Sequence, residues 1–416
     1  MDSKTAIVSR RNNCRLCGGT DLELALPLTP APIVDAYVPA EKLDVVQESF
    51  PLDLYLCQCC GHAQLLDVVD PEVLYGEYIY VTNSSLGLVE HFDQYAEDVL
   101  SQIKPLPGSL VVDIGSNDGT LLQAFQKRGM QVLGIDPAVE IAENATKAGI
   151  ETKPVFFSFE ESKRIREEHG TASIITVNNL FANVDDLGDL ANGIANLLSP
   201  DGVFLFESYY VLDLARNMVF DFIYHEHLNS FSAKPLDAFF KRYGMELIDV
   251  QGVSTKGGSL RGTVQLSGAD RGVSPSVADF IRKEEDAAVH SLGFFQEFGA
   301  VINEKKDRLV EFLDEAKSQG KSVAGYGASA STTPLVYHFG IGDRLTFMAD
   351  DNPAKQHLYS PGLHIPVLPS DSLYEKKPDY VVILAWRYAD AIIEKHQSYL
   401  DQGGHFIIPL PTLTVV

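Results

Sequence analysis

The stretch Leu110–Thr120 carries residues whose types and spacing most directly indicate chemistry. An apolar run ends at Asp113, and glycines follow at positions 115 and 119. Gly115 allows a tight turn close to a ligand, and Gly119 gives the same freedom where a helix is expected to begin. Such a loop presents backbone N–H groups and the positive end of a helix, with the Asp113 carboxylate as an acceptor. The pattern predicts a cofactor loop, and the alternative is a tight strand–helix turn that binds nothing.

A second carboxylate stands at the end of the next apolar stretch. Gln131–Asp136 ends in an acid that can accept hydrogen bonds from both hydroxyls of a ribose, as in nucleotide-binding folds. The first loop lacks the third glycine of the dinucleotide fingerprint and the Gly-Lys-Ser/Thr of a P-loop. It resembles motif I of the S-adenosylmethionine-dependent methyltransferases. The residues expected to bind S-adenosylmethionine are Asp113, Gly115, Asn117, Gly119, Asp136, Asn178 and Tyr80.

The cysteines form a second candidate site. All five lie within residues 14–60, which in a reducing compartment indicates metal binding rather than disulfide bonds. Two Cys-x-x-Cys pairs are each followed by a glycine, and four thiolates suit a tetrahedral zinc ion with no vacant position. We therefore expect a structural zinc, with Cys59 as a spare thiol and His62 as an alternative ligand. The expected ligands are Cys14, Cys17, Cys57 and Cys60, with a hairpin filling residues 18–56.

A third group of reactive side chains follows the expected strand Val203–Glu207. The run Asp221–His227 is dense in acid–base groups and contains two histidines. A structural or metal-binding histidine pair is the alternative, but no third ligand stands at a suitable spacing. Asn183 follows another expected strand, Ser173–Asn178, at the carboxyl end of the sheet. Open α/β sheets bind ligands at that end, so we expect these side chains to face a substrate.

The elements that must position these residues alternate along the chain. From residue 110 onward, apolar strands alternate with helical patterns, which predicts a parallel, doubly wound α/β sheet. Residues 276–319 read as a long amphipathic helix or helix pair. A strand then enters the glycine-rich turn Gly325–Ser331, typical of a Rossmann-like module in which Ala330 replaces the third glycine of the fingerprint. We expect a zinc-binding domain over 1–70, a methyltransferase domain over 71–275, and a connector with a Rossmann-like domain over 276–416.

Composition limits the classes of partner. The 416 residues carry 33 basic against 57 acidic side chains, a formal net charge of −24. Most of such a surface repels a phosphate backbone, which argues against nucleic acid and anionic membranes as partners. No stretch reaches the roughly 18 to 20 apolar residues of a membrane span, and the first residues lack the apolar core of a signal peptide. We expect a cytoplasmic protein; the oligomeric state is left open, a monomer included.

The ordered set of motifs resembles one family over essentially the whole chain. The cysteine pairs, the loop at 113–120, Tyr224–His227, the turn at 325–331 and Trp386–Tyr388 are together similar to the sugar C-methyltransferases of deoxysugar pathways. The resemblance implies a zinc domain, a class I methyltransferase domain and a C-terminal Rossmann-like domain that enclose a nucleotide-linked 4-keto sugar. It implies that the carbon next to the ketone is methylated and that the C-terminal module binds the nucleotide, with the glycine-rich turn cradling the diphosphate.

The same resemblance implies roles for individual residues. It places a general base at the second histidine of Tyr-x-Glu-His, here His227, with Tyr224 and Glu226 orienting or assisting it. His225 occupies the variable position of that motif. Related enzymes often carry histidine where this chain has Asn183, which can hydrogen-bond a ketone or enolate but cannot shuttle a proton. The expected reaction is enolisation by a base poised near neutral pH, followed by in-line methyl transfer.

Three other functions fit parts of the chain. An O- or N-methyltransferase needs a base but no enolate, so solvent deuterium entering the substrate beside its ketone separates it from a C-methyltransferase. A non-catalytic sugar-nucleotide-binding or scaffold protein with a degraded cofactor loop is opposed by the intact acids at Asp113 and Asp136. An NAD-dependent enzyme using Gly325–Ser331 predicts thermal stabilisation by NAD rather than by S-adenosylmethionine.

Overall fold

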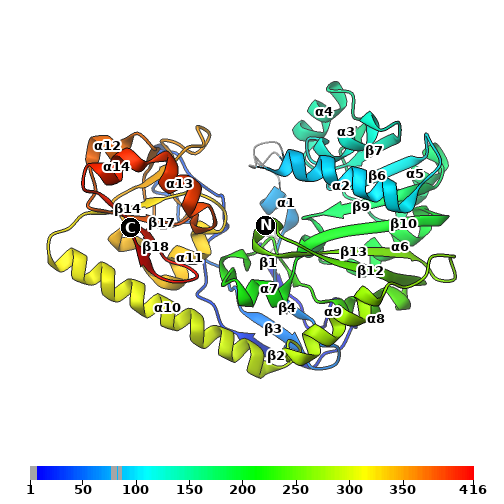
Figure 1. The fold of residues 1–416 in the computed structure, drawn as a ribbon, viewed down its shortest axis with the longest axis horizontal. Helices are drawn as coiled ribbons and strands as arrows, with labels where there is room; N and C mark the ends of the chain where they lie inside the picture. The colour runs from blue at the N-terminus through cyan, green and yellow to red at the C-terminus, as the bar shows by residue number, and fades with distance from the viewer. Residues whose placement is uncertain (1–6, 76–81, 83–86) are drawn as a thin grey trace, which may run out of the picture.

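A seven-stranded sheet forms the centre of the computed structural model, which describes residues 7–75, 82 and 87–416 (Figure 1). Across the sheet the strands are β12 (Met245–Val253), β13 (Ser259–Leu266), β10 (Leu198–Tyr209), β9 (Ala172–Asn178), β6 (Leu110–Ile114), β7 (Gln131–Ile135) and β8 (Thr152–Lys153). The predicted α/β fold is confirmed, but the expectation of a wholly parallel sheet is wrong at β13, which pairs antiparallel with both neighbours. A short turn joins β12 to β13, so β13 must run back alongside it.

Helices cover both faces of this sheet, because successive strand residues point to opposite sides and both sides are apolar. Val111 packs in a buried cluster with side chains of α2 and α3, whereas Val112 belongs to the larger cluster that includes side chains of α5, α6 and α8. The helices of this region are α2 (Leu88–Ile103), α3 (Thr120–Lys127), α4 (Val139–Lys147), α5 (Phe159–His169), α6 (Leu187–Leu197), α7 (Val211–Arg216) and α8 (Ala233–Arg242). Because helices cover both faces of the sheet, its polar side chains can meet a ligand only at the ends of the strands.

A smaller sheet carries the cysteines. Its strands are β11 (Asn229–Ser230), β4 (Ala63–Leu65), β3 (Leu54–Cys57) and β2 (Leu22–Leu26), and β1 (Val8–Arg10) pairs separately with β5 (Asp67–Val69) before α1 (Pro71–Tyr75). β2 and β3 pair antiparallel, as the expected hairpin requires. Between them, however, residues 27–53 form a long segment with one 3₁₀ turn, η1 (Ala40–Lys42), which we call the strap. β11 joins this sheet from a part of the chain far beyond the cysteines.

The strap reaches the C-terminal domain. Val38 forms an isolated antiparallel bridge with Tyr359. The Asp35 carboxylate accepts a hydrogen bond from Lys355 Nζ at 2.6 Å. At its far end, the carbonyl of Phe50 lies 3.2 Å from His225 Nε2. The zinc-bearing region is thus tied by one segment to both of the other regions.

The C-terminal domain is built on a six-stranded sheet. Its strands in spatial order are β16 (Val367–Pro369), β15 (Met348–Asp350), β14 (Val323–Tyr326), β17 (Tyr380–Ile383), β18 (His405–Ile408) and β19 (Thr414–Val415). Numbered by sequence, the five parallel strands run 3-2-1-4-5, the Rossmann order, so the predicted Rossmann-like module is confirmed. Its helices are α11 (Thr332–Phe339), α12 (Ser372–Lys376), α13 (Ala389–Lys395) and α14 (Gln397–Asp401), with a 3₁₀ turn η6 (Gly342–Arg344).

A helix pair connects the two large domains, α9 (Pro275–Asp286) and α10 (Leu292–Ser318). α10 begins where the Ser291 hydroxyl accepts from Phe294 N, and its buried side chains recur at helical spacing along one face. It runs past β2 on its way to the C-terminal domain (Figure 1). Although α10 has 27 residues, no helix within the described ranges is long and apolar enough to cross a lipid bilayer.

A buried carboxylate joins the two large domains directly. Asp221 lies in the 3₁₀ turn η4 (Phe220–Phe222), and its Oδ2 accepts from Trp386 Nε1 at 3.0 Å and Arg387 Nη1 at 3.2 Å. Both donors belong to η7 (Trp386–Tyr388). Burial raises the pKa of Asp221, and the neighbouring Arg387 opposes that rise. Trp386 and Arg387 thus hold the two large domains together.

Asp221→Ala is expected to destabilise the protein by about 3 kcal/mol, since it leaves a partly buried guanidinium and a buried indole N–H without their acceptor. The free energy of unfolding, measured in a urea titration, would reveal the loss. Asp307→Ala is the matched control, because Asp307 is exposed on α10 and its removal should change stability by no more than about 0.5 kcal/mol. Equal stability of the two variants would contradict a role for Asp221 in joining the domains.

Candidate active site and zinc cluster

The four predicted zinc ligands lie together. Their sulfur atoms are all within 4.8 Å of one another, and Cys14 to Cys60 and Cys17 to Cys57 are each separated by 3.6 Å. A zinc ion with Zn–S bonds of about 2.3 Å requires sulfur separations of roughly 3.8 Å, which fits this set. Cys59 is exposed and stands outside the cluster, as predicted.

His62 is not a zinc ligand; it connects the zinc cluster to the segment after His227. Its Nε2 lies 3.0 Å from Asn229 Oδ1, and its ring stacks on Phe231 at 5.6 Å. Ala63 and Gln64 of β4 pair with β11 directly downstream of His227. The knuckle that holds the metal therefore also holds the predicted acid–base segment.

The cofactor loop has the geometry that its glycines predicted. Gly115 and Gly119 both have φ of 77°, and a side chain on Gly115 would lie 2.7 Å from Leu180. α3 begins directly after Gly119. Asn117, at φ 50°, accepts a hydrogen bond from Thr82 N on its Oδ1 at 2.8 Å. The backbone of the loop is therefore held close to its neighbours and cannot accept larger residues at the turn.

Both predicted acids shape this loop. Asp136 Oδ2 accepts from Asn117 N at 2.9 Å and Oδ1 from Ala138 N at 2.9 Å, which leaves each oxygen a further lone pair for a ribose hydroxyl. Asp113 accepts from the Thr176 hydroxyl at 2.6 Å. Burial raises the pKa of Asp113 to about 7, and the nearby Asp136 carboxylate adds to the rise.

The loop and its surroundings suit S-adenosylmethionine. Asn178 ends β9, and both polar atoms of its buried amide lack a hydrogen-bond partner within the described ranges. Such a group requires a partner that a ligand can supply. Tyr80, also predicted to bind the cofactor, lies outside the described residues. The bound cofactor supplies an electrophilic methyl group on a sulfonium.

The acid–base segment is fixed at both ends. His227 Nδ1 lies 2.6 Å from the Phe222 carbonyl, and the Tyr224 ring packs on the imidazole with centroids 4.0 Å apart. Burial lowers the pKa of His227 to about 3, so its ring is neutral. Asn183 ends the 3₁₀ turn η3 (Phe181–Asn183), and the Asn229 amide donates to the carbonyls on either side of it. Through Asn229, the structure brings Asn183 to the same segment as His227.

Charged side chains from three separate regions of the chain act on Glu226. Burial raises its pKa to about 8, the strap residue Asp35 adds to the rise, and Lys256 and Lys355 oppose it. None of Asp35, Lys256 and Lys355 was predicted from the sequence as a site residue. No local pattern marks them, because each reaches the site through tertiary packing.

The glycine-rich turn of the C-terminal domain differs from what its sequence suggested. Ala328 N donates to the Asp350 carboxylate, and Ser329 N lies 3.2 Å from Thr332 Oγ1. Lys355 Nζ binds the Ala328 carbonyl at 2.7 Å. Side chains of the neighbouring β15 and α11 therefore occupy N–H groups that a diphosphate would use, and the Asp350 charge would repel one. This arrangement disfavours both the predicted diphosphate cradle and the NAD alternative.

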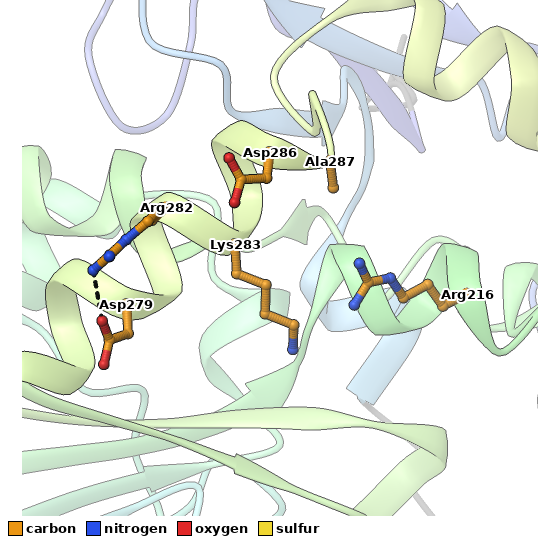
Figure 2. A pocket seen from close by; sticks show the side chains of 6 residues that line it. All are labelled: Arg216, Asp279, Arg282, Lys283, Asp286 and Ala287. Carbon is orange, nitrogen blue, oxygen red and sulfur yellow. Dashed lines mark hydrogen bonds and ion pairs between the residues drawn. The ribbon is translucent and has the colours of Figure 1, made fainter.

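Two pockets flank this region. A cavity of about 640 Å³ lies between the two large domains and is lined by Lys256, Gly257, Trp386, Arg387 and Tyr388 among others. Figure 2 shows a smaller one of about 320 Å³, into which Lys283 of α9 and Arg216 of α7 point. Arg282 at its rim is paired with Asp279 at 2.7 Å. Neither lining includes a predicted site residue, but Lys256 in the larger one acts electrostatically on Glu226 and His227.

These features define a methyltransferase that uses S-adenosylmethionine and carries a four-cysteine zinc site. A family model described as a methyltransferase domain matches residues 89–250, a zinc binding domain model matches 14–75, and a C-methyltransferase C-terminal domain model matches 254–411. The chain is 32% identical to the C-methyltransferase NovU of Streptomyces niveus over 411 residues, 99% of this chain and 98% of that one. The chain belongs to this C-methyltransferase family.

More distant similarity is confined to part of the chain. A ubiquinone biosynthesis O-methyltransferase of Colwellia psychrerythraea is 23% identical over 156 residues, 34% of this chain and 63% of that protein. Among solved structures, the PH0226 protein of Pyrococcus horikoshii covers 46% of this chain and 98% of its own, at 12% identity and a TM-score of 0.38. The NovU match, which spans the full chain, is the one that identifies the family.

Protein purified without added metal is expected to contain one zinc per chain by elemental analysis. Cys57→Ser should lose the ion and lower the melting temperature, because a structural zinc contributes folding free energy. Cys59→Ser removes a thiol from the same knuckle but outside the cluster, so it should retain the metal. A fully folded and active preparation without metal would refute the structural role.

Proposed function

We propose that this C-methyltransferase acts on a nucleotide-linked 4-keto deoxysugar and methylates the carbon next to the ketone. In this proposal His227 removes the proton from that carbon, Tyr224 orients His227, and Glu226 and Asn183 hydrogen-bond the sugar or its enolate. The loop from Asp113 to Gly119, with Asp136 and Asn178, holds S-adenosylmethionine. The family relationship supports carbon as the methylated atom, and the neighbouring site residues support a ketone as the activating group.

The tautomer of His227 is the observation that carries this proposal. A carbonyl oxygen can only accept, so the Nδ1 atom facing Phe222 at 2.6 Å must bear the hydrogen. The neutral ring then exposes an unprotonated Nε2, the form that a general base requires. The packed ring of Tyr224 keeps the imidazole in this orientation. Tyr224 therefore acts as a positioning residue for the base.

His227 is also a weak base, and this sets a condition on the rest of the site. Burial lowers its pKa to about 3, so it holds a proton less firmly than an ordinary histidine. Removal of a proton beside a ketone must then depend strongly on groups that stabilise the enolate oxygen. Glu226, whose pKa is raised to about 8, is protonated at neutral pH and supplies one hydrogen-bond donor.

The nucleotide end is assigned to the cavity between the large domains. Its volume of about 640 Å³ is in the range typical of ligand pockets. Arg387 and the aromatic rings of Trp386 and Tyr388 line it, a combination suited to a diphosphate and a base. This placement moves the diphosphate away from the glycine-rich turn, where Asp350 already accepts from Ala328 N.

A screen of nucleotide-linked 4-keto sugars, made in situ and incubated with S-adenosylmethionine, tests the proposal by mass detection of an added methyl group. The same sugars, incubated with enzyme and S-adenosylhomocysteine in D₂O, should exchange the proton beside the ketone. An O- or N-methyltransferase would add a methyl group without such exchange. Failure to methylate any keto sugar would reject the substrate class.

His227→Ala is expected to reduce methyl transfer by about 10²–10⁴-fold and to abolish the proton exchange, since it removes the base. His225→Asn should be milder, because His225 faces the Phe50 carbonyl of the strap and not the proposed substrate. Rapid-quench rates and deuterium incorporation measured by NMR compare the two variants. Persistent exchange in His227→Ala would make His227 a positioning residue and assign the base elsewhere.

The alkaline side of the pH–rate profile should report Glu226. Its pKa is raised to about 8, so the protonated donor prevails below that pH and is lost above it. We therefore expect kcat/KM to fall as the pH rises through about 8. Glu226→Gln keeps a hydrogen-bond donor that does not titrate, and its profile should lack this fall. An unchanged alkaline limb in Glu226→Gln would assign the titration to another group.

A further inference from the structure

The turn between β12 and β13 has an unusual backbone. Lys256, in the 3₁₀ turn η5 (Thr255–Gly257), has φ 57° and ψ 23°, and Gly257 and Gly258 follow with φ of 85° and 122°. Three consecutive residues with positive φ include one that bears a long side chain, for which this conformation is unfavourable. Such a conformation persists only where the surroundings impose it, and it is found most often at functional sites.

Several contacts impose this conformation. Thr255 Oγ1 donates to Glu207 Oε1 at 2.8 Å, and Asn217 Nδ2 donates to the Gly257 carbonyl at 2.8 Å. A side chain on Gly258 would lie 2.5 Å from Asp213 Cβ, so the turn is pressed against α7. These contacts together hold the turn in place.

Glu207, which accepts the hydrogen bond from Thr255, is itself held in place by other side chains. The carboxylate is fully buried at the carboxyl end of β10, where it accepts from Arg261 at 2.9 Å and faces His91 Nε2 at 3.0 Å. These partners keep the pKa of Glu207 low despite the opposing effect of its burial. Glu207 therefore has a structural role, which is to position the turn through Thr255.

The turn places the Lys256 ammonium beside the acid–base segment. Lys256 lines the cavity between the domains, and its charge lowers the pKa of both Glu226 and His227.

We propose that Lys256 is a catalytic residue whose ammonium donates a hydrogen bond to the enolate oxygen of the substrate. His227 Nε2 takes the proton, the C–H electron pair forms the enolate C=C bond, and the carbonyl pair moves to the oxygen facing Lys256. The enolate carbon then bonds to the sulfonium methyl, and the C–S pair stays with sulfur. This inference rests on the proposed function. It adds a charged hydrogen-bond donor to the enolate oxygen, which the reaction needs because His227 is a weak base and Asn183 cannot supply a proton.

The test compares Lys256→Met with wild type on a keto sugar that wild type methylates. Lys256→Met should lose about 10²–10³-fold in both methyl transfer and deuterium exchange, as expected for the loss of one oxyanion donor. Its affinity for S-adenosylmethionine, measured by calorimetry, should stay within about twofold. Lys256→Arg keeps the charge and should retain part of the exchange. Lys241→Met, which removes an exposed lysine of α8, is the matched control.

Each alternative outcome overturns the proposal in a distinct way. Unchanged exchange and methyl transfer in Lys256→Met would exclude Lys256 from catalysis. A loss of nucleoside diphosphate affinity with kcat preserved would make Lys256 a phosphate-binding residue. Zinc content and melting temperature report whether Lys256→Met folds. If it does not, Lys256→Gln takes its place in the comparison. Deuterium exchange by Lys256→Arg that is no faster than exchange by Lys256→Gln would then reject a role for the charge. Absence of exchange in wild type would instead reject the proposed function itself.

Discussion

The pairing of β11 with β4 is the contact on which the proposed active site depends. By sequence, the segment that contains His227 belongs to the methyltransferase region, yet directly afterwards the chain joins the zinc-bearing sheet through Asn229 and Ser230. His62, adjacent to the metal knuckle, contacts Asn229, and Asn229 in turn binds the carbonyls around Asn183. The zinc site thereby stabilises the positions of side chains that do not themselves bind the metal.

Local sequence signals predicted those parts of the structure that depend on neighbours along the chain. The cysteine pairs, the glycines at 115 and 119, and the strands ending at Asp113 and Asp136 all appear where their patterns indicated. These features follow from turn conformations and strand periodicity, which a short stretch of sequence determines. The Rossmann-like character of the C-terminal domain was likewise predictable, from the strand that enters the glycine-rich turn before a helix.

Features set by distant contacts could not be predicted in this way. Nothing near Asp35 indicates that the strap crosses to Lys355, and nothing near Ala328 shows that Asp350 will occupy its N–H group. The direction of β13 depends on which strand it pairs with, which apolar periodicity does not reveal. The net charge of −24 likewise conceals the lysines that face Glu226 across the cleft. An acidic exterior with cations inside repels anions in general but favours one that fits the cavity.

The strap and α10 together connect the three regions in a ring, so that each region is joined to both of the others. Along the chain, α10 is the sole covalent connection from the methyltransferase region to the C-terminal domain, yet the strap joins the C-terminal domain back to the zinc-bearing sheet through Val38 and Asp35. A hinge at α10 alone cannot open such a ring without breaking these strap contacts. They comprise the Val38–Tyr359 bridge, the Asp35–Lys355 ion pair, and hydrogen bonds from Thr29 N to His338 and from Gly362 N to Gln47. A motion that separates the C-terminal domain from the zinc-bearing sheet must break all of them.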